Sequence, residues 1–260
     1  MPSEALIRTI TTLTCVLAML CIACGVTNAH SPAEFLLVTK VQPGNAIEHG
    51  LELQDRFDAA RVMTDLRGPR FHAVGCNAVD SKASPSVAFL TGYEVAMEPR
   101  NAELTALDVM DTVRGAVETE IQVDIANPQL VFLPAQRLGS GTPKEVPHGL
   151  DHYKAYSIES PKSVSETISI QADGATSQWQ LLRPLYLCIA TKKWHHGDFD
   201  DATHPSACFV IYEASSTVKA ASQGQAAVAT LDELGLNRLE TVSTTWVAAR
   251  AALFSSQDLK

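Results

Sequence analysis

The sequence lacks the features that usually identify a nucleic-acid-binding or glycosylated protein. It contains no run of five or more Lys and Arg residues, and its 20 Lys and Arg are outnumbered by 29 Asp and Glu, which gives a net charge of −9. No Asn-x-Ser/Thr acceptor occurs after residue 29. Because an acidic surface repels phosphate backbones and anionic lipid, the composition argues against nucleic acid as a partner and against adsorption to anionic membranes.

Known catalytic signatures are also missing. The chain has no G-x-S-x-G, no H-E-x-x-H and no Walker loop. GSGTPK, from Gly139, has the small residues of a phosphate-binding loop but the wrong spacing, so we expect a hairpin loop there. A Ser–His–Asp set assembled only by the fold would leave no such pattern. A secreted hydrolase with its site on inter-strand loops therefore stays open as an alternative.

Charge is absent from residues 10–27, an apolar stretch that follows the short polar segment MPSEALIR. Thr27 and Ala29 then occupy the −3 and −1 positions of a signal-peptidase site. We predict an export signal over residues 1–29 and a mature chain in the periplasm or outside the cell. The alternatives are a lipoprotein cut before Cys24 and an uncleaved single-span anchor, since about eighteen apolar residues can just cross a bilayer.

A periodic pattern runs through the rest of the chain. Four short apolar runs, VGCNAVDSK, LVFLPAQRL, YLCIATKKW and WVAARAALF, have Cys76, Phe132, Cys188 and Ala248 as their third residues, spaced by 56, 56 and 60. A second marker (LVTKV, TGYEV, KAYSI, CFVI) and a third (QDRF, MDTV, IQADG, LDELG) accompany these runs in the same order. The markers predict a fourfold repeat of roughly 57 residues. Its approximate bounds are 35–90, 91–153, 154–206 and 207–253.

The residues between the markers indicate strands. ETEIQVDI and SETISIQ alternate apolar and polar residues with a period of two, and Pro and Gly clusters separate such segments. We therefore predict an all-β fold, an internally repeated sandwich or barrel with about three to four strands per repeat. Whether the repeats form one body or two paired sub-domains stays open. Trp194 and Trp246 border apolar runs and are expected to pack.

Cysteine is scarce after the export signal, where only Cys76, Cys188 and Cys208 occur. An odd number in an oxidising compartment predicts one disulfide and one leftover thiol. Cys188 lies in the third apolar run and Cys208 begins the next CFVI marker, whereas the matching positions of the second repeat hold Phe132 and Ala155. Both cysteines are thus missing there together. We therefore predict a Cys188–Cys208 disulfide and a buried free thiol at Cys76.

Three segments resemble motifs of a known family. DHYKAYSI, LDELG and YLCIATKKW are similar to the D-H-F/Y-K-C-Y-x-V, D-Q-F-G and L-C-x-P-x-x-K motifs of a family of exported bacterial repeat domains of unknown function. Ala155 stands where that family has Cys, and Ala190 where it has Pro. The resemblance implies an exported, disulfide-bearing β domain and transfers no catalytic residue.

Potential metal ligands are concentrated in the stretch KWHHGDFDDATHPSACF, which begins at Lys193. Imidazole and carboxylate groups suit zinc, copper or nickel, so the candidate ligands are His195, His196, Asp198 and His204. Polar, Pro-containing segments also follow the first two apolar runs, so we expect this stretch to be a solvated inter-strand loop. A periplasmic metal-binding protein is the alternative, with His148 or His152 from the preceding repeat as a further ligand.

These observations predict an exported, non-catalytic β-repeat domain. We expect a structural or binding module with a protein or glycan partner, with no cofactor unless a transition metal binds at the His/Asp stretch. We expect no nucleic-acid partner and no transmembrane segment in the mature chain.

Overall fold

The computed structural model describes residues 33–42, 48–81, 88–96, 100–114, 119–139, 150–159, 161–172, 174–217 and 227–254. Its regular elements are antiparallel β-strands, which confirms the predicted all-β class. Residues Pro32–Lys260 form one compact unit. The predicted export signal and, apart from Gly139, the GSGTPK loop lie outside the described residues.

Twelve of the described strands fall into four sets, each with two short strands of 6–9 residues followed by a long one of 17–21. The sets are β1 (Phe35–Val41), β2 (Glu48–Gln54) and β3 (Val62–Ala78); β4 (Phe89–Val95), β5 (Leu104–Asp111) and β6 (Thr119–Leu138); β7 (His152–Glu159), β8 (Glu166–Ala172) and β9 (Ala175–His195); and β11 (Cys208–Ser216), β12 (Ala227–Asp232) and β13 (Gly235–Phe254). β10 (Asp198–Asp200) is an addition to the third set. We interpret each set as one repeat, and the predicted boundaries at residues 91 and 154 then fall inside β4 and β7.

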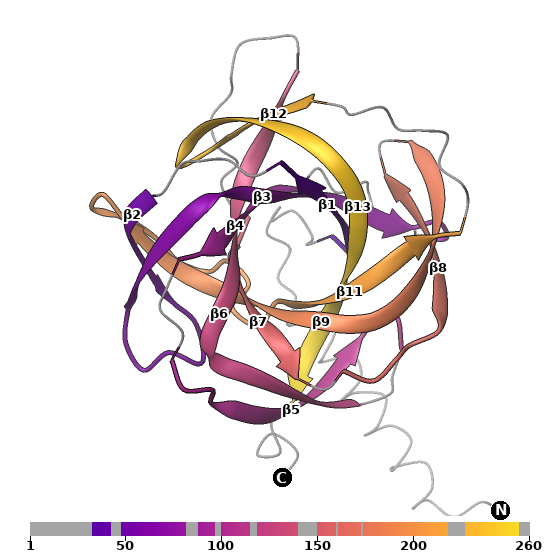
Figure 1. Ribbon diagram of the computed structural model, residues 1–260, viewed down its shortest axis with the longest axis horizontal. Helices are drawn as coiled ribbons and strands as arrows, with labels where there is room; N and C mark the ends of the chain where they lie inside the picture. Colours follow the sequence, from indigo (N-terminus) through magenta and orange to yellow (C-terminus); the bar gives the residue numbers. More distant parts are fainter. Residues whose placement is uncertain are drawn as a thin grey trace, which may run out of the picture. The chain divides into compact units, whose positions relative to one another are not determined.

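The first and third strands of the sets form a closed ring of eight antiparallel strands (Figure 1). The order around the ring is β1, β3, β4, β6, β7, β9, β11 and β13, and β13 pairs with β1. The N-terminal part of each long strand also forms a hairpin with the second strand of its own set. A sandwich and a barrel were the two predicted architectures, and a sheet that closes into a ring corresponds to the barrel.

The second strands connect sets that are not neighbours in the chain. β2 pairs with β9, β5 with β13, β8 with β3 and β12 with β6. Each second strand thus bonds to the long strand two sets away. Together with the ring, this pairing joins every set to all three others.

Alternating side chains divide the core between the inside and the outside of the ring, because successive residues of a strand point to opposite faces. One apolar cluster takes residues from all eight ring strands and therefore fills the interior; its members include Leu36, Phe71, Leu90, Phe132, Tyr153, Cys188, Phe209 and Ala248. Two further clusters lie between the ring and the hairpins, one around Tyr156, Leu187 and Val247 and the other around Leu51, Leu53 and Tyr93. Trp246 stacks on Phe71, with ring centroids 4.4 Å apart, and so packs as predicted.

A buried Tyr–Asp hydrogen bond recurs three times between sets two apart. The hydroxyl donates to the carboxylate over 2.7 Å in Tyr93–Asp232, 2.6 Å in Tyr156–Asp55 and 2.5 Å in Tyr212–Asp111. Each of these aspartates also accepts the backbone N–H two residues later, which closes a turn into the long strand. The aspartates belong to the QDRF, MDTV and LDELG markers, so the periodic markers coincide with the contacts that tie opposite sets together.

The predicted Cys188–Cys208 disulfide is not formed. Both cysteines are buried free thiols, and so is Cys76. On the paired strands β9 and β11, Cys188 lies opposite Phe209 and Cys208 lies opposite Ile189. This offset of one residue places the Cys188 side chain inside the ring and the Cys208 side chain outside it, so the two sulfur atoms are on opposite faces.

The error arose from the alignment of CFVI with KAYSI. The Tyr–Asp bonds make Tyr212 equivalent to Tyr156, which aligns Ile211 rather than Cys208 with Ala155. Ala155 itself lies directly opposite Cys188 on the neighbouring strand β7. Ala155, the residue opposite Cys188, is thus the position that holds Cys in the D-H-F/Y-K-C-Y-x-V motif of the similar family.

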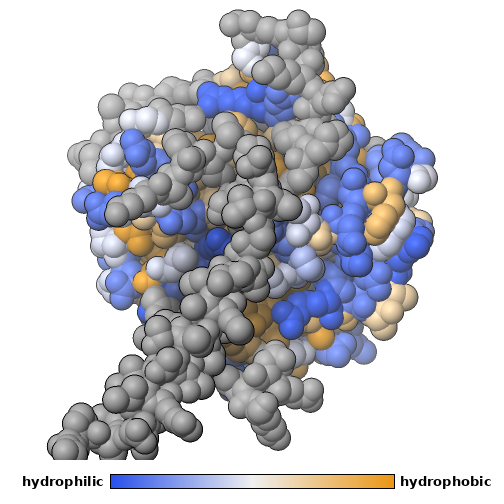
Figure 2. All heavy atoms as spheres, turned by 180° about the vertical axis from the view of Figure 1, so that it is seen from behind, coloured by the Kyte–Doolittle hydropathy of each residue, from blue (hydrophilic) through white to orange (hydrophobic). Residues whose placement is uncertain are grey.

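Hydrophilic residues predominate on the part of the described surface visible in Figure 2, with smaller hydrophobic areas between them. Within the described ranges, no helix is long and apolar enough to span a membrane. The exposed large hydrophobic side chains of the described residues are Met63, Val79, Leu104, Phe199, Leu236 and Val242.

Candidate functional site

The histidine- and aspartate-rich stretch begins as an ordered hairpin, where a solvated loop was predicted. β9 ends at His195, and β10 returns along it with Asp198 opposite His195. The two turn residues, His196 and Gly197, have φ values of 49° and 93°. Two-residue hairpin turns with positive φ at both positions match the twist of the flanking strands, and glycine adopts this backbone without strain.

The four predicted metal ligands do not come together. His195 is buried, whereas His196 and Asp198 are exposed at the hairpin turn. His204 lies with its Nδ1 3.1 Å from the Asp151 carboxylate, which also accepts the backbone N–H of His204. No three of the four predicted ligands place their ligand atoms within 4.8 Å of one another.

A different set of potential ligands lies beside the hairpin. His152, Asp200 and Glu233, from β7, β10 and the turn between β12 and β13, bring one ligand atom each within 4.8 Å of the others. The ammonium group of Lys193 forms ion pairs with both carboxylates, 2.7 Å from Asp200, and the residue is 3% exposed. This lysine already supplies a positive charge to the cluster, so a metal ion would have to displace it.

His152 is the neutral member of this cluster. Its Nε2 lies 3.3 Å from Glu233 Oε1. Burial lowers the pKa of His152 to about 4, and the positive charge of Lys193 lowers it in the same direction. The imidazole is therefore uncharged at neutral pH.

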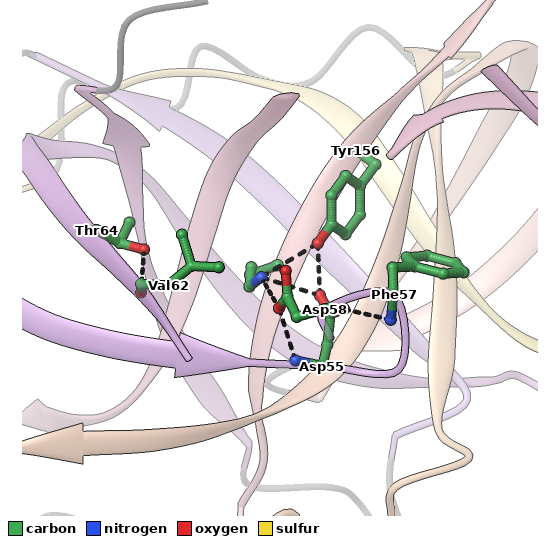
Figure 3. A network of polar contacts seen from close by, with 7 residues as sticks. Asp55, Phe57, Asp58, Val62, Thr64 and Tyr156 are labelled. Carbon is green, nitrogen blue, oxygen red and sulfur yellow. Dashed lines mark hydrogen bonds and ion pairs between the residues drawn. The ribbon is translucent and has the colours of Figure 1, made fainter. Parts of the chain in front are cut away.

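A second buried ammonium group lies two residues further along β7. Lys154 is 1% exposed and forms ion pairs with Asp58 and with Asp55, the latter at 3.3 Å, while its Nζ is 3.2 Å from Tyr156 Oη. Figure 3 shows Asp55, Asp58 and Tyr156 converging from the β2–β3 connection and from β7. Desolvation raises the pKa of Asp55, and the charge of Lys154 lowers it in part.

These ion pairs join distant parts of the chain, with both lysines buried and Asp200 exposed. The carboxylates come from the β2–β3 connection, from β10 and from the β12–β13 turn, and the two lysines come from β7 and β9. A small cavity of the described part lies elsewhere, inside the ring, and is lined by apolar side chains, Tyr153 and Cys188. The charged cluster is therefore suited to holding these elements in place.

The opposite side of the same strands carries a row of side chains that are exposed at both ends and half-buried in the middle. In register, Met63 of β3 lies opposite Glu52 of β2, Glu52 opposite Trp194 of β9, and Trp194 opposite Phe199 of β10. Directly opposite residues share a face of the sheet. Met63 and Phe199 are 55% and 51% exposed, the Trp194 and Phe199 rings stack at 4.9 Å, and the Arg61 guanidinium lies 4.1 Å from the Trp194 centroid.

Several residues of the two lysine clusters and of the exposed sheet face were not among the predicted site residues. Lys154, Lys193 and Glu233 were not singled out, although a lysine within the apolar KAYSI strand is a signal that a buried partner is needed. Trp194 was expected only to pack. It does pack, on Phe199 and Arg61, but on an exposed sheet face.

The comparisons with known proteins agree with the repeated strand pattern. A family model described as a repeat of unknown function (DUF7450) matches residues 89–250, from the start of β4 to within β13, which is more than half of the chain. No curated protein and no solved structure matches the chain. The resemblance to a repeat family of unknown function is confirmed at this level, and the chain belongs to the DUF7450 family of repeats.

Proposed function

We propose that the chain is an exported, non-catalytic binding module that contacts its partner through the outer face of β3, β2, β9 and β10. We call this surface the Trp194 face and define it as Glu52, Arg61, Met63, Lys192, Trp194, Phe199 and Asp201. The observation that carries the proposal is the row in which the exposed side chains of Met63 and Phe199 lie at the two ends, with Glu52 and the half-buried Trp194 between them. Trp, Phe, Met and Arg are the residue types enriched where proteins bind partners, and exposed apolar rows on a polar surface commonly mark such sites.

The support beneath the Trp194 face favours binding. Leu51 and Leu53 of β2 are 0% exposed, and Lys193 and His195 of β9 are buried on the inner side of the same strands. A face whose backbone and inner side chains are already fixed loses little conformational freedom when a partner binds. The hydrolase and metal-protein alternatives have less support, because the carboxylates of the two clusters beside β7 already pair with lysine ammonium groups.

The export part of the proposal rests on the apolar residues 10–27 and on Thr27 and Ala29. Intact mass spectrometry of the protein recovered from the periplasm or the medium should give a chain that begins at His30. A lipid-bearing chain beginning at Cys24, or a chain that retains residue 1, would contradict cleavage after Ala29.

Binding can be tested by co-sedimentation with washed cell envelopes of the organism that produces the protein. We expect the replacements Trp194→Ala and Phe199→Ala each to weaken retention roughly tenfold, as expected for central aromatic contacts. Leu236→Ala and Val242→Ala are matched controls, because these side chains are 68% and 54% exposed on β13, outside the Trp194 face. Equal retention of all four variants and the wild type would refute this function.

A further inference from the structure

The Trp194 face also carries information about the kind of molecule it fits. It contains a row one side chain wide that crosses four strands, in which Met63, Trp194 and Phe199 are apolar and the carboxylate of Glu52 lies between Met63 and Trp194. Neighbouring strands lie about 4.8 Å apart, so the row is about 14 Å long. An extended, narrow ligand can cover such a row from end to end, whereas a broad protein surface would also have to cover the polar groups on both sides.

The aromatic rings offer a surface for stacking. Phe199 is 51% exposed and nearly parallel to Trp194, at an interplanar angle of 26°. An aromatic ring face is electron-rich and attracts the weakly positive hydrogens of C–H groups. Sugar rings present C–H groups on their faces and hydroxyls at their rims, so they can stack on such rings while their hydroxyls reach polar neighbours.

The charges on the Trp194 face are paired with one another. Arg61 lies 3.5 Å from Glu52, and Lys192 lies 3.2 Å from Asp201. The four formal charges sum to zero. An anionic ligand would meet Glu52 and Asp201 as well as the cations, and a cationic ligand would meet the opposite arrangement, so neither gains a net attraction.

The same paired groups can hydrogen-bond to a neutral ligand. Their side chains are 36–60% exposed, so their donors and acceptors are accessible from solvent. Guanidinium and ammonium groups donate to hydroxyl oxygens, and carboxylates accept from hydroxyl hydrogens. Stacking along the row and hydroxyl contacts on both sides are together the chemistry of a sugar chain.

We infer that the Trp194 face binds a neutral polysaccharide, laid along the row from Met63 to Phe199. This inference rests on the proposed function and narrows it to one ligand class. The row supplies the stacking surface, and the Arg61–Glu52 and Lys192–Asp201 pairs supply polar contacts without selecting for charge.

Affinity electrophoresis of the exported protein tests this inference directly. Native gels would contain hydroxyethyl cellulose, dextran, galactomannan or arabinoxylan as neutral polymers, with alginate as the anionic control. We expect at least one neutral polymer to retard the wild type, and Trp194→Ala or Phe199→Ala to reduce that retardation at least roughly tenfold. Val242→Ala, outside the face, should be retarded like the wild type.

A second variant separates neutral from charged ligands. The double replacement Lys192→Gln with Asp201→Asn removes both charges and keeps polar side chains, so retardation should change less than roughly twofold and should not depend on salt. Retardation by alginate alone, or by none of the neutral polymers, would overturn the inference.

The envelope assay distinguishes failure of the polysaccharide inference from failure of the proposed binding function. Trp194-dependent envelope binding that survives periodate oxidation of sugars but is lost after protease treatment would identify a protein partner. That result would support the proposed binding function and contradict the polysaccharide inference. Envelope binding that does not depend on Trp194 would contradict both.

Discussion

Strands β4 and β7 occupy equivalent places in successive sets, yet their outer faces differ in charge. Both carry a buried tyrosine that donates to an aspartate from the set two positions away, Tyr93 to Asp232 and Tyr156 to Asp55. Among the described residues, no lysine or arginine forms an ion pair with Asp232, the partner of Tyr93 on β4, and Asn237 instead donates to this carboxylate over 3.1 Å. The tie between opposite sets therefore does not require a buried cation.

The residues that precede the tyrosine differ between β4 and β7. Two and four residues before the tyrosine, β4 has Thr91 and Phe89, whereas β7 has Lys154 and His152. Lys154 reaches the connection after β2, the uncharged His152 lies beside Asp200 at the end of β10, and both β2 and β10 belong to the Trp194 face. The comparison indicates that the fold can be built without these two polar side chains and that they support the strands of the Trp194 face.

Removal of the lysine should give the largest effect. Lys154→Met would leave the buried Asp55 and Asp58 without their cation, and breaking a buried ion pair on one side typically costs about 3–5 kcal/mol. Urea unfolding at neutral pH measures the loss. Lys192→Met is the matched control, because its pair with Asp201 is exposed and should contribute about 0–1 kcal/mol.

A partial rescue would show that charge rather than packing is responsible. Adding Asp58→Asn to Lys154→Met removes one of the two uncompensated carboxylates and should recover part of the lost stability. A Lys154→Met protein within about 1 kcal/mol of the wild type would contradict the distinction drawn between β7 and β4.

The side chains that face the inside of the ring also differ in size between β7 and β4. Ala155 of β7 lies opposite Cys188, whereas Gly92 of β4 lies opposite Phe132. Ala155→Cys should form a cross-strand disulfide with Cys188, because directly paired strand residues are close enough to bridge. Closing the intervening loop should stabilise the protein by about 3–4 kcal/mol in the chain-entropy model.

Thiol titration in denaturant, followed by unfolding with and without reductant, would measure the effect of Ala155→Cys. The reverse outcome is expected on β4, because an added Cβ at Gly92 would lie 2.7 Å from a ring carbon of Phe132. Gly92→Ala should therefore cost about 1–3 kcal/mol by overpacking. An Ala155→Cys protein with no loss of titratable thiols would show that the two faces are not aligned as described.

A further difference between the two strands concerns the pH dependence of stability. The pKa of His152 is about 4 in the folded chain, below its ordinary value of 6.5, so the unfolded chain takes up the proton first as the pH falls. The stability that depends on neutral His152 is complete above pH 6.5 and is lost towards pH 4, by about 3 kcal/mol. His152→Phe, which places the β4 residue on β7, should flatten this part of the profile.

Urea unfolding between pH 7 and pH 4 compares the two slopes. Burial raises the pKa of Asp55 and Asp232, which makes stability fall as the pH rises above their ordinary range, but both proteins share this opposite trend. The difference between the slopes therefore isolates His152. Identical slopes would indicate that His152 titrates alike in the folded and unfolded chains.

The strands and their repetition could be predicted because they depend on local patterns. Apolar runs, alternation and the turn-forming aspartates all leave traces in short segments, and the structure places strands or tight turns at these markers. The polar pairs could not be predicted in this way. Lys154 meets Asp55 because β2 bonds to β9, in the set two positions away, and nothing near either residue in the sequence indicates that partner.

Two further differences show the limits of local patterns. A disulfide between β9 and β11 depends on whether two cysteines are directly opposite or one residue apart, and that register is fixed by the Tyr–Asp ties. Trp194 and Trp246 border similar apolar runs, yet one lies on the exposed sheet face and the other stacks against Phe71. Only the three-dimensional pairing of the strands distinguishes them.

The pairing of each second strand with the set two positions away has a consequence for how repeats of this kind can vary in number. In solenoid proteins each repeat contacts only its neighbours, so units can be added or lost at the ends. Here every set bonds to the other three, and β13 bonds back to β1. A duplication or deletion of one set would leave a second strand without its opposite partner, so copy number in this arrangement is fixed by closure rather than open to gradual extension.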